Sequence, residues 1–157
     1  MRESFKVGVS FGLTSGIITT LGLMVGLNAG THSRIAVLSG ILTIAIADAC
    51  SDALGIHISE ESENRHAARE IWESTVLTFL SKFVFACSFL VPVLVFDLST
   101  AIIVATVWGF SLLGGLSFLI ARAEKARAWP VITEHLAIAA VVVLVTEGLG
   151  HLLQRLL

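Results

Sequence analysis

The chain of 157 residues is 55% hydrophobic and 14% charged, and its mean hydropathy is +0.91. Soluble domains are about 45–50% apolar and about 25% charged, so this composition excludes an ordinary soluble domain and indicates a membrane protein. The net charge of −2 is too small to indicate nucleic-acid binding.

Five apolar stretches predict transmembrane helices, because each is close to the length of about 20 residues that crosses a bilayer. They cover residues 7–29, 35–58, 75–96, 101–120 and 131–153. The polar segment 59–73 contains neither Gly nor Pro, which predicts a short cytoplasmic helical segment after the second span. We therefore expect an all-α polytopic membrane protein in which residues 1–157 form one transmembrane domain.

The first span contains glycines at intervals of four residues, in two series. This spacing places small residues on one side of a helix and lets a neighbouring backbone approach closely. The neighbour is either another helix of the same subunit or a second subunit across a dimer interface, and the sequence leaves both alternatives open. The glycines are Gly8, Gly12 and Gly16 in the first series and Gly22, Gly26 and Gly30 in the second.

The second span places two carboxylates, Asp48 and Asp52, inside its apolar length. They are one helical turn apart and lie on one face. A carboxylate at membrane depth costs roughly 2.5–3.5 kcal/mol, so it normally faces a partner, a cavity or an ion. The acidic residues beyond this span indicate the mouth of a cation path; the alternative is a solvated face balanced by Arg65 and Arg69. They are Glu60, Glu61, Glu63, Glu70 and Glu73, accompanied by His66.

The later spans contain further candidates. Pro92 should bend or end the third helix locally, and Lys82 lies either near a membrane surface or against an acid. Glu147 and His151 are one turn apart in the fifth span, a spacing that suits a divalent-metal pair or a proton relay. The alternatives are a Glu–His hydrogen bond between helices, or a helix end in the headgroups.

Two cysteines, Cys50 and Cys87, lie in apolar sequence with no CxxC pairing, which predicts two inert buried thiols. The sequence shows no paired nucleophile and base and no phosphate-binding glycine loop. We therefore expect no enzyme.

The distribution of cations predicts the orientation. With alternating spans, the N-terminus, the 59–73 segment and the 121–129 linker share one side of the membrane. That side contains Arg2, Lys6, Arg65, Arg69, Arg122, Lys125 and Arg127, whereas the other contains Arg34 and Arg155. Because cytoplasmic loops are enriched in Lys and Arg, the N-terminus is expected in the cytoplasm. The small size and the lack of a targeting segment suggest a prokaryotic plasma membrane.

Two stretches carry a family resemblance. Residues 15–30 (SGIITTLGLMVGLNAG) resemble a first-helix pattern, Asp-Gly-x-x-Thr-Thr and a glycine-rich run, and residues 47–59 (ADACSDALGIHIS) resemble a second-helix pattern, Ala-Asp-Ala-x-Ser-Met-x-x-Gly-Glu-Tyr-x-Ser. Both belong to the vacuolar iron transporter (VIT) family of membrane iron and manganese transporters, of which this chain looks like a short, divergent member. The resemblance implies a homodimeric antiporter that exports Fe²⁺ or Mn²⁺ from the cytosol in exchange for protons. The cation is cargo, and no prosthetic group is expected.

Three positions depart from the family pattern. The family aspartate of the first helix falls on Ser15, its methionine ligand falls on Asp52, and its second-helix glutamate falls on Ile56, whereas Asp48 matches. Replacing a thioether by a carboxylate makes the site harder and more negative. We therefore expect Asp52 to supply the charge that Ser15 lacks. The expected metal-site residues are Asp48, Asp52, Ser15, Glu60, Glu61, Glu63, Glu147 and His151.

Two other functions fit the same acidic pair. In the first, the carboxylates conduct only protons or monovalent cations. In the second, the protein is a membrane scaffold that transports nothing, and its acids form buried hydrogen bonds between helices. The scaffold alternative predicts that Asp48→Asn and Asp52→Asn weaken the dimer or the fold without changing metal binding.

Overall fold

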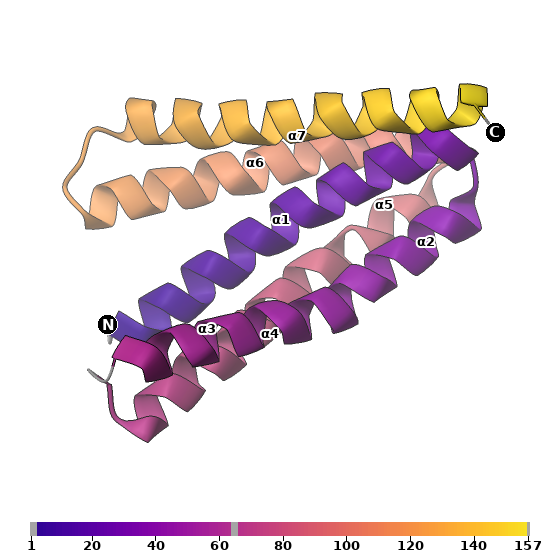
Figure 1. Cartoon of the computed structure of the whole chain (residues 1–157). Coiled ribbons are helices and arrows are strands. Elements are labelled where there is room, and N and C mark those ends of the chain that lie inside the picture. Colours follow the sequence, from indigo (N-terminus) through magenta and orange to yellow (C-terminus); the bar gives the residue numbers. More distant parts are fainter. Residues whose placement is uncertain (1–2, 64–65, 157) are drawn as a thin grey trace.

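The computed structural model describes residues 3–63 and 66–156, with side chains from residue 6 onward. The chain is helical, in the order shown in Figure 1. The elements are α1 (Glu3–Thr31), α2 (Arg34–Thr43), the π-helix η1 (Ile44–Asp48), α3 (Ala49–Glu63), α4 (Ala68–Ser88), α5 (Leu90–Val95), α6 (Leu98–Ala123) and α7 (Ala128–Leu156).

Five helices are long and apolar enough to cross a membrane, which confirms the all-α, five-span expectation. The second span runs without interruption through α2, η1 and α3, and the third combines α4 with α5. α3 ends at Glu63 and α4 begins at Ala68, so the segment 59–73 is divided between the ends of two long helices. The candidate spans are Lys6–Thr31, Arg34–Glu63, Ala68–Val95, Leu98–Ala123 and Ala128–Leu156.

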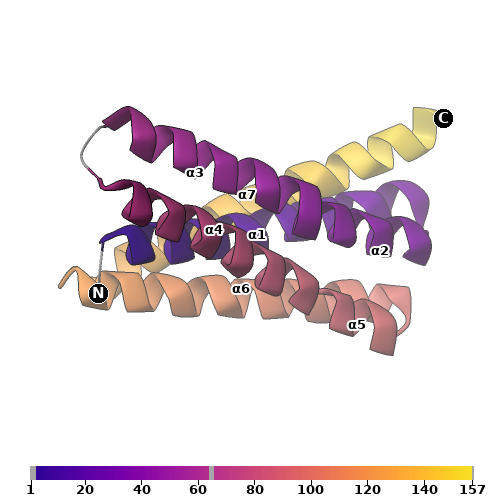
Figure 2. The ribbon, with the colours of Figure 1, turned by 90° about the horizontal axis from the view of Figure 1, so that it is seen from below.

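α1 is the central helix. It packs most extensively against α4 and α7, and it crosses between the α6–α7 pair and the α3–α4 pair (Figure 1). The two ends of the chain lie at opposite ends of the bundle, as an odd number of crossings requires (Figure 2). The antiparallel helices α3 and α4 lie side by side and meet near the N-terminal end.

The two glycine series of α1 contact two different helices of the same chain. A Cβ atom added to Gly12 would lie 2.5 Å from the Thr78 carbonyl oxygen of α4, and one added to Gly8 would meet Ser74. The second series, Gly22, Gly26 and Gly30, faces Val142, Thr146 and Gly150 of α7. Of the two alternatives for these glycines, the structure therefore shows packing within one subunit.

The core differs between the two ends of the bundle. Apolar residues including Ile17, Leu21, Val37, Phe89 and Val93 form one buried cluster, to which α6 and α7 also contribute. The buried face of α4 is instead polar in its middle: Ser74, Thr78 and Lys82 lie between Ile71 and Ala86. This polar face lies beneath the first glycine series.

Two helices are interrupted. The third span breaks at Phe89, close to Pro92, because a proline donates no backbone hydrogen bond and its ring crowds the preceding turn. In the second span, the Ala49 N–H bonds to the Ile44 carbonyl five residues earlier, which is the pattern of a π-helix. This wider turn ends at Asp48.

The π turn has a packing reason. The buried apolar residues of the second span recur every fourth position, at Val37, Ile41, Ala45, Ala49 and Ala53. Along a regular α-helix such a row drifts by about 40° at each step, because four residues exceed one turn of 3.6. A π turn removes part of this drift and keeps the row against α1 and α4.

Candidate cation site

The two carboxylates of the second span converge with Ser15 of α1 on the ammonium group of Lys82, from α4. The Lys82 Nζ atom lies 2.5 Å from Asp52 Oδ2, 2.6 Å from Asp48 Oδ2 and 2.8 Å from Ser15 Oγ. Ser15 also donates a hydrogen bond of 2.6 Å to Asp52 Oδ2. We call these four residues the Asp48–Asp52–Ser15–Lys82 cluster.

The cluster lies at the middle of the membrane-spanning segments. Asp48 is the fifteenth residue of the Arg34–Glu63 span, and Lys82 is the fifteenth of the Ala68–Val95 span. The Lys82 side chain is 0% exposed, the Asp52 side chain 20% and the Asp48 side chain 33%. An isolated ion at such a place costs several kcal/mol, so the three charges depend on one another.

The two carboxylates are not equivalent. Asp52 accepts hydrogen bonds from both Ser15 and Lys82. The Asp48 oxygen nearest Lys82 is close enough for an ion pair, but its geometry is not that of a hydrogen bond. Asp52 is therefore the more firmly held carboxylate, and Asp48 is the more open one.

Close packing between α1 and α4 puts Lys82 in reach of Ser15. A Cβ atom added to Gly16, the residue after Ser15, would lie 3.2 Å from both the Cα atom and the carbonyl oxygen of Lys82. A larger residue at Gly16 would therefore push the two helices apart. The sequence alternatives for Lys82 were a surface position or an acidic partner, and the structure shows two acidic partners.

The acidic residues at and after the end of the second span differ in their burial and in their hydrogen bonds. Glu60 is 7% exposed, and its Oε2 atom lies 3.5 Å from His66 Nδ1, with no hydrogen bond to either atom. Glu61 and Glu63 are exposed. Glu70 accepts a hydrogen bond from the Ala67 N–H and so caps α4. Arg65, part of the solvated-face alternative, lies outside the described residues.

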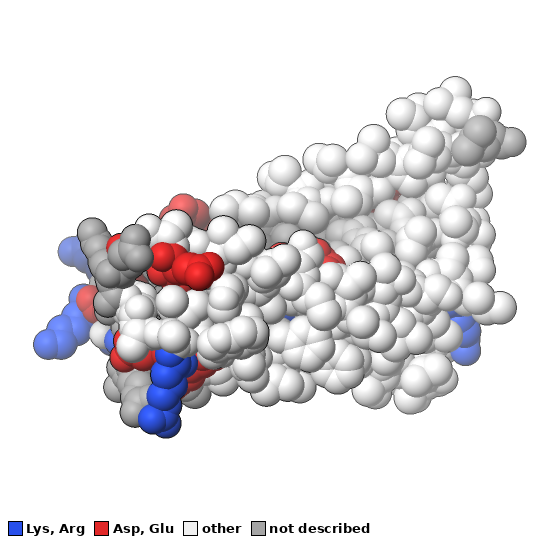
Figure 3. Space-filling model, turned by 60° about the horizontal axis from the view of Figure 1, so that its bottom comes forward, with Lys and Arg blue, Asp and Glu red and all other residues white. Residues whose placement is uncertain are grey.

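Charged side chains gather at the end of the molecule where α3 meets α4, as Figure 3 shows. The middle of that face is uncharged except for a small acidic area. This separation agrees with a membrane-spanning body that contains few ionised groups at its surface.

Glu147 and His151 are exposed on α7 and are not brought to the cluster. The contacts of α7 with α1 run through Val142, Thr146 and Gly150, on a different side of the helix. Within residues 3–63 and 66–156, no group of three or more His, Cys, Asp and Glu side chains is arranged to hold a metal ion.

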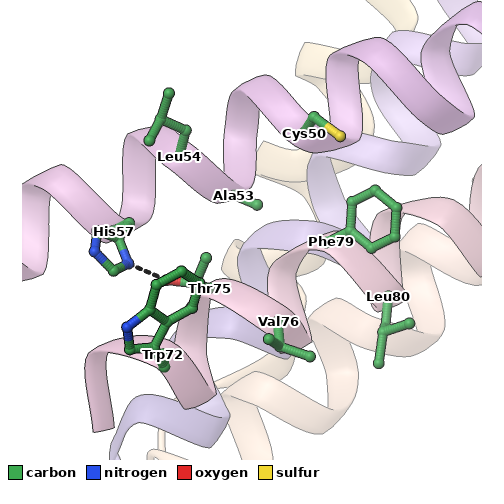
Figure 4. A pocket seen from close by; sticks show the side chains of 9 residues that line it. All are labelled: Cys50, Ala53, Leu54, His57, Trp72, Thr75, Val76, Phe79 and Leu80. Atoms are coloured by element: carbon green, nitrogen blue, oxygen red, sulfur yellow. Dashed lines mark hydrogen bonds between the residues drawn. The ribbon is translucent and has the colours of Figure 1, made fainter. Parts of the chain in front are cut away.

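An open groove of about 380 Å³ runs between α3 and α4 (Figure 4). Its lining is almost entirely apolar. His57 Nδ1 is 2.9 Å from Thr75 Oγ1, and the His57 ring meets Trp72 edge-on at 4.7 Å. The imidazole is thus engaged with its neighbours, and the groove offers little to a cation.

The cysteine prediction is wrong for Cys50, which lines this groove and is exposed, while Cys87 is half-buried. An apolar sequence environment does not imply burial in a protein whose outer surface is itself apolar. The two cysteines are free.

Comparison with known protein families finds a match in the first part of the chain. Residues 9–73 match the model of the VIT family, which is 65 of the 157 residues. The matched stretch includes Ser15, Asp48 and Asp52 and ends before Lys82. No significant match was found among curated proteins or among solved structures. Over residues 9–73 the chain is therefore similar to the VIT family, whose members are membrane transporters.

Proposed function

We propose that this protein transports divalent metal cations of the Fe²⁺ and Mn²⁺ class out of the cytosol through Asp48 and Asp52. One observation carries the proposal: two carboxylates and a serine from separate helical segments converge at mid-span. Buried acids at this depth are characteristic of ion pathways. Oxygen ligands of this kind suit Mn²⁺ and other hard divalent cations.

The route runs along the second span and turns partly around it. On a regular α-helix Asp52 is rotated by about 40° from Asp48, and Glu60 by about 80° from Asp52 in the same sense. Glu60 is about 12 Å beyond Asp52 along the axis, at the charged end of the molecule. We propose that this end is the cytoplasmic mouth, where Glu61 and Glu63 attract cations.

The proposed orientation places the N-terminus in the cytoplasm. Among the described residues, Lys6, Arg69, Arg122, Lys125 and Arg127 belong to the N-terminal end of the bundle, and Arg34 and Arg155 to the other; Arg2 and Arg65 lie outside the described residues. The excess of cations supports a cytoplasmic location for the N-terminal end. The proposed location is the plasma membrane of a prokaryote.

We also propose a homodimer. Octahedral coordination of a hard divalent ion takes about six oxygen ligands, and one chain supplies two carboxylates with few neutral oxygens. The partly open side of Asp48 allows ligands from a second copy of the chain to complete the shell. Exchange with protons is proposed from the family resemblance alone.

A pathway for protons or monovalent cations is the second candidate, and Lys82 is the observation that favours it. The lysine neutralises one of the two aspartates, so the cluster as a whole has a formal charge of −1. That charge is balanced by a single monovalent cation.

Flux into proteoliposomes tests these proposals. Wild-type protein, Asp48→Asn and Asp52→Asn would be compared for Fe²⁺, Mn²⁺, Mg²⁺, Ca²⁺ and Na⁺, with internal pH followed in parallel. Glu134→Gln is a suitable control, because Glu134 is an exposed carboxylate of α7. Saturable divalent flux with opposite proton movement, lost in both aspartate variants, supports the metal carrier. Flux of Na⁺ or protons alone supports the second candidate, and the absence of any flux from folded protein supports a scaffold.

A further inference from the structure

We propose that Lys82 determines the charge of the cation that the site accepts. Its ammonium group occupies the centre of the Asp48–Asp52–Ser15–Lys82 cluster and disfavours divalent cations relative to monovalent ones. The inference rests on the proposed function, because it concerns the same two carboxylates: it holds that Lys82 lowers the affinity of their site for divalent cations without abolishing divalent transport.

The position of the Lys82 ammonium is that of a bound cation. Three oxygen atoms from α1, η1 and α3 surround Nζ at 2.5–2.8 Å. Metal–oxygen distances in Ca²⁺ sites are about 2.3–2.6 Å, so the oxygens are already gathered as they would be around an ion. The lysine side chain is completely buried and lies against the backbone of α1, so it does not extend to a membrane surface.

The charge count then favours one class of cation. With Lys82 in place, the two carboxylates and one ammonium sum to −1, and a monovalent cation brings the cluster to neutrality. A divalent cation leaves a net charge of +1 at mid-membrane, which the low dielectric makes costly. With a neutral residue at position 82, the cluster would have a charge of −2 and would match a divalent cation.

The proximity of like charges acts in the same direction. A cation bound by Asp48 and Asp52 lies within a few ångströms of the ammonium, unless the lysine moves away. Their repulsion scales with the charge of the bound ion, so it is twice as large for Mn²⁺ as for Na⁺. Lys82 therefore penalises divalent cations more strongly than monovalent ones.

Three variants separate charge from shape. Lys82→Gln removes the positive charge, and Lys82→Arg keeps it. The double variant Lys82→Gln with Asp48→Asn removes the ammonium and one carboxylate, which restores the wild-type charge of −1. Binding of Mn²⁺ and of Na⁺ to purified protein would be measured by calorimetry at constant pH, together with the unfolding temperature of each variant.

The expected result is a rise of at least about tenfold in the affinity of Lys82→Gln for Mn²⁺ relative to Na⁺, equivalent to about 1.4 kcal/mol. Lys82→Arg should retain the wild-type preference, and the double variant should return towards it. Unchanged Mn²⁺ preference in Lys82→Gln, in a protein whose Mn²⁺ binding is lost in Asp52→Asn, overturns the inference and leaves the proposed function intact. Absence of cation binding in wild type and in every variant overturns both.

A second comparison keeps the test decisive if Lys82→Gln does not fold. Asp48→Asn alone has a cluster charge of 0, and the double variant has a charge of −1. The inference predicts that adding Lys82→Gln to the Asp48→Asn background strengthens cation binding by at least about tenfold. Equal binding by these two variants contradicts it.

Discussion

The Lys82 ammonium and the Asp52 carboxylate form an ion pair of 2.5 Å at mid-span, and Ser15 hydrogen bonds to both groups. Asp52 stands where the pattern of the resembled family has a methionine, and Ser15 stands where that pattern has an aspartate. Relative to that pattern, the site gains a negative charge at Asp52 and loses one at Ser15, and the positive charge of Lys82 partly offsets Asp52. The polar centre is held between α1, α3 and α4, and α4 packs extensively against both of the other helices.

Replacing Asp52 should destabilise the protein more than replacing Asp48. Asp52→Asn removes a hydrogen-bonded partner of a completely buried ammonium, whereas Asp48 is more exposed and only ion-paired. Loss of a partner from a buried pair costs about 3–5 kcal/mol; since Asp52 retains some exposure and Lys82 keeps Asp48, we expect about 2 kcal/mol. Unfolding in detergent measures both variants, and an equal or larger loss for Asp48→Asn contradicts the assignment.

Enlarging Gly12 should separate α1 from α4. An alanine there would bring its Cβ atom within 2.5 Å of the Thr78 carbonyl oxygen, and overpacking of this kind costs about 1–3 kcal/mol. Gly114→Ala is the matched control, because a Cβ atom at Gly114 meets nothing within 4 Å and alanine favours a helix. Unfolding temperatures should fall for Gly12→Ala and stay equal or rise for Gly114→Ala; the reverse order contradicts the packing.

The five spans were predictable because apolar length alone identifies a membrane helix. The pairing of Lys82 was also within reach of the sequence. Lys82 lies 14 residues after the start of α4, and Asp52 and Asp48 lie 11 and 15 residues before the end of α3. In an antiparallel helix pair these positions have similar depth, so a comparison of depths would have favoured an acidic partner over a surface position.

The partners of the glycines were harder to predict. Spacing identifies a face suited to close approach but does not name the neighbour. The step from Gly16 to Gly22 is six residues, or about 240° around the helix, which already separates the two series into different faces. Which helices pack against those two faces depends on the arrangement of all five spans. A local sequence pattern does not determine that arrangement, so it could not identify α4 and α7 as the neighbours.

Glu147→Gln should leave cation binding at Asp48 and Asp52 unchanged. The residue is exposed on α7, which packs against α1 and α6 and contributes no atom to the cluster. Calorimetry with Mn²⁺ on Glu147→Gln and His151→Ala, beside Asp52→Asn, measures this. A loss in either α7 variant comparable to that in Asp52→Asn would show that the fifth span belongs to the site.

Asp97 should contribute a pH-dependent cap to α6. Its carboxylate accepts a hydrogen bond of 3.0 Å from the Thr100 N–H, and this bond holds the pKa of Asp97 below its ordinary value. A lowered pKa means that the contribution is present above the ordinary value and is lost as pH falls below about 4.

The variant Asp97→Asn keeps an acceptor at the cap but cannot titrate. Its unfolding temperature should therefore fall less on acidification than that of the wild type. An identical response of the two proteins to acid would show that the cap carboxylate contributes nothing to the pH dependence.

The most direct test of the account is Mn²⁺ flux into proteoliposomes by wild type and Asp52→Asn, with Glu134→Gln as control. The account predicts saturable uptake by wild type and by Glu134→Gln, with loss in Asp52→Asn while the variant remains folded. Undiminished uptake by folded Asp52→Asn would contradict the assignment of the pathway to the mid-span carboxylates.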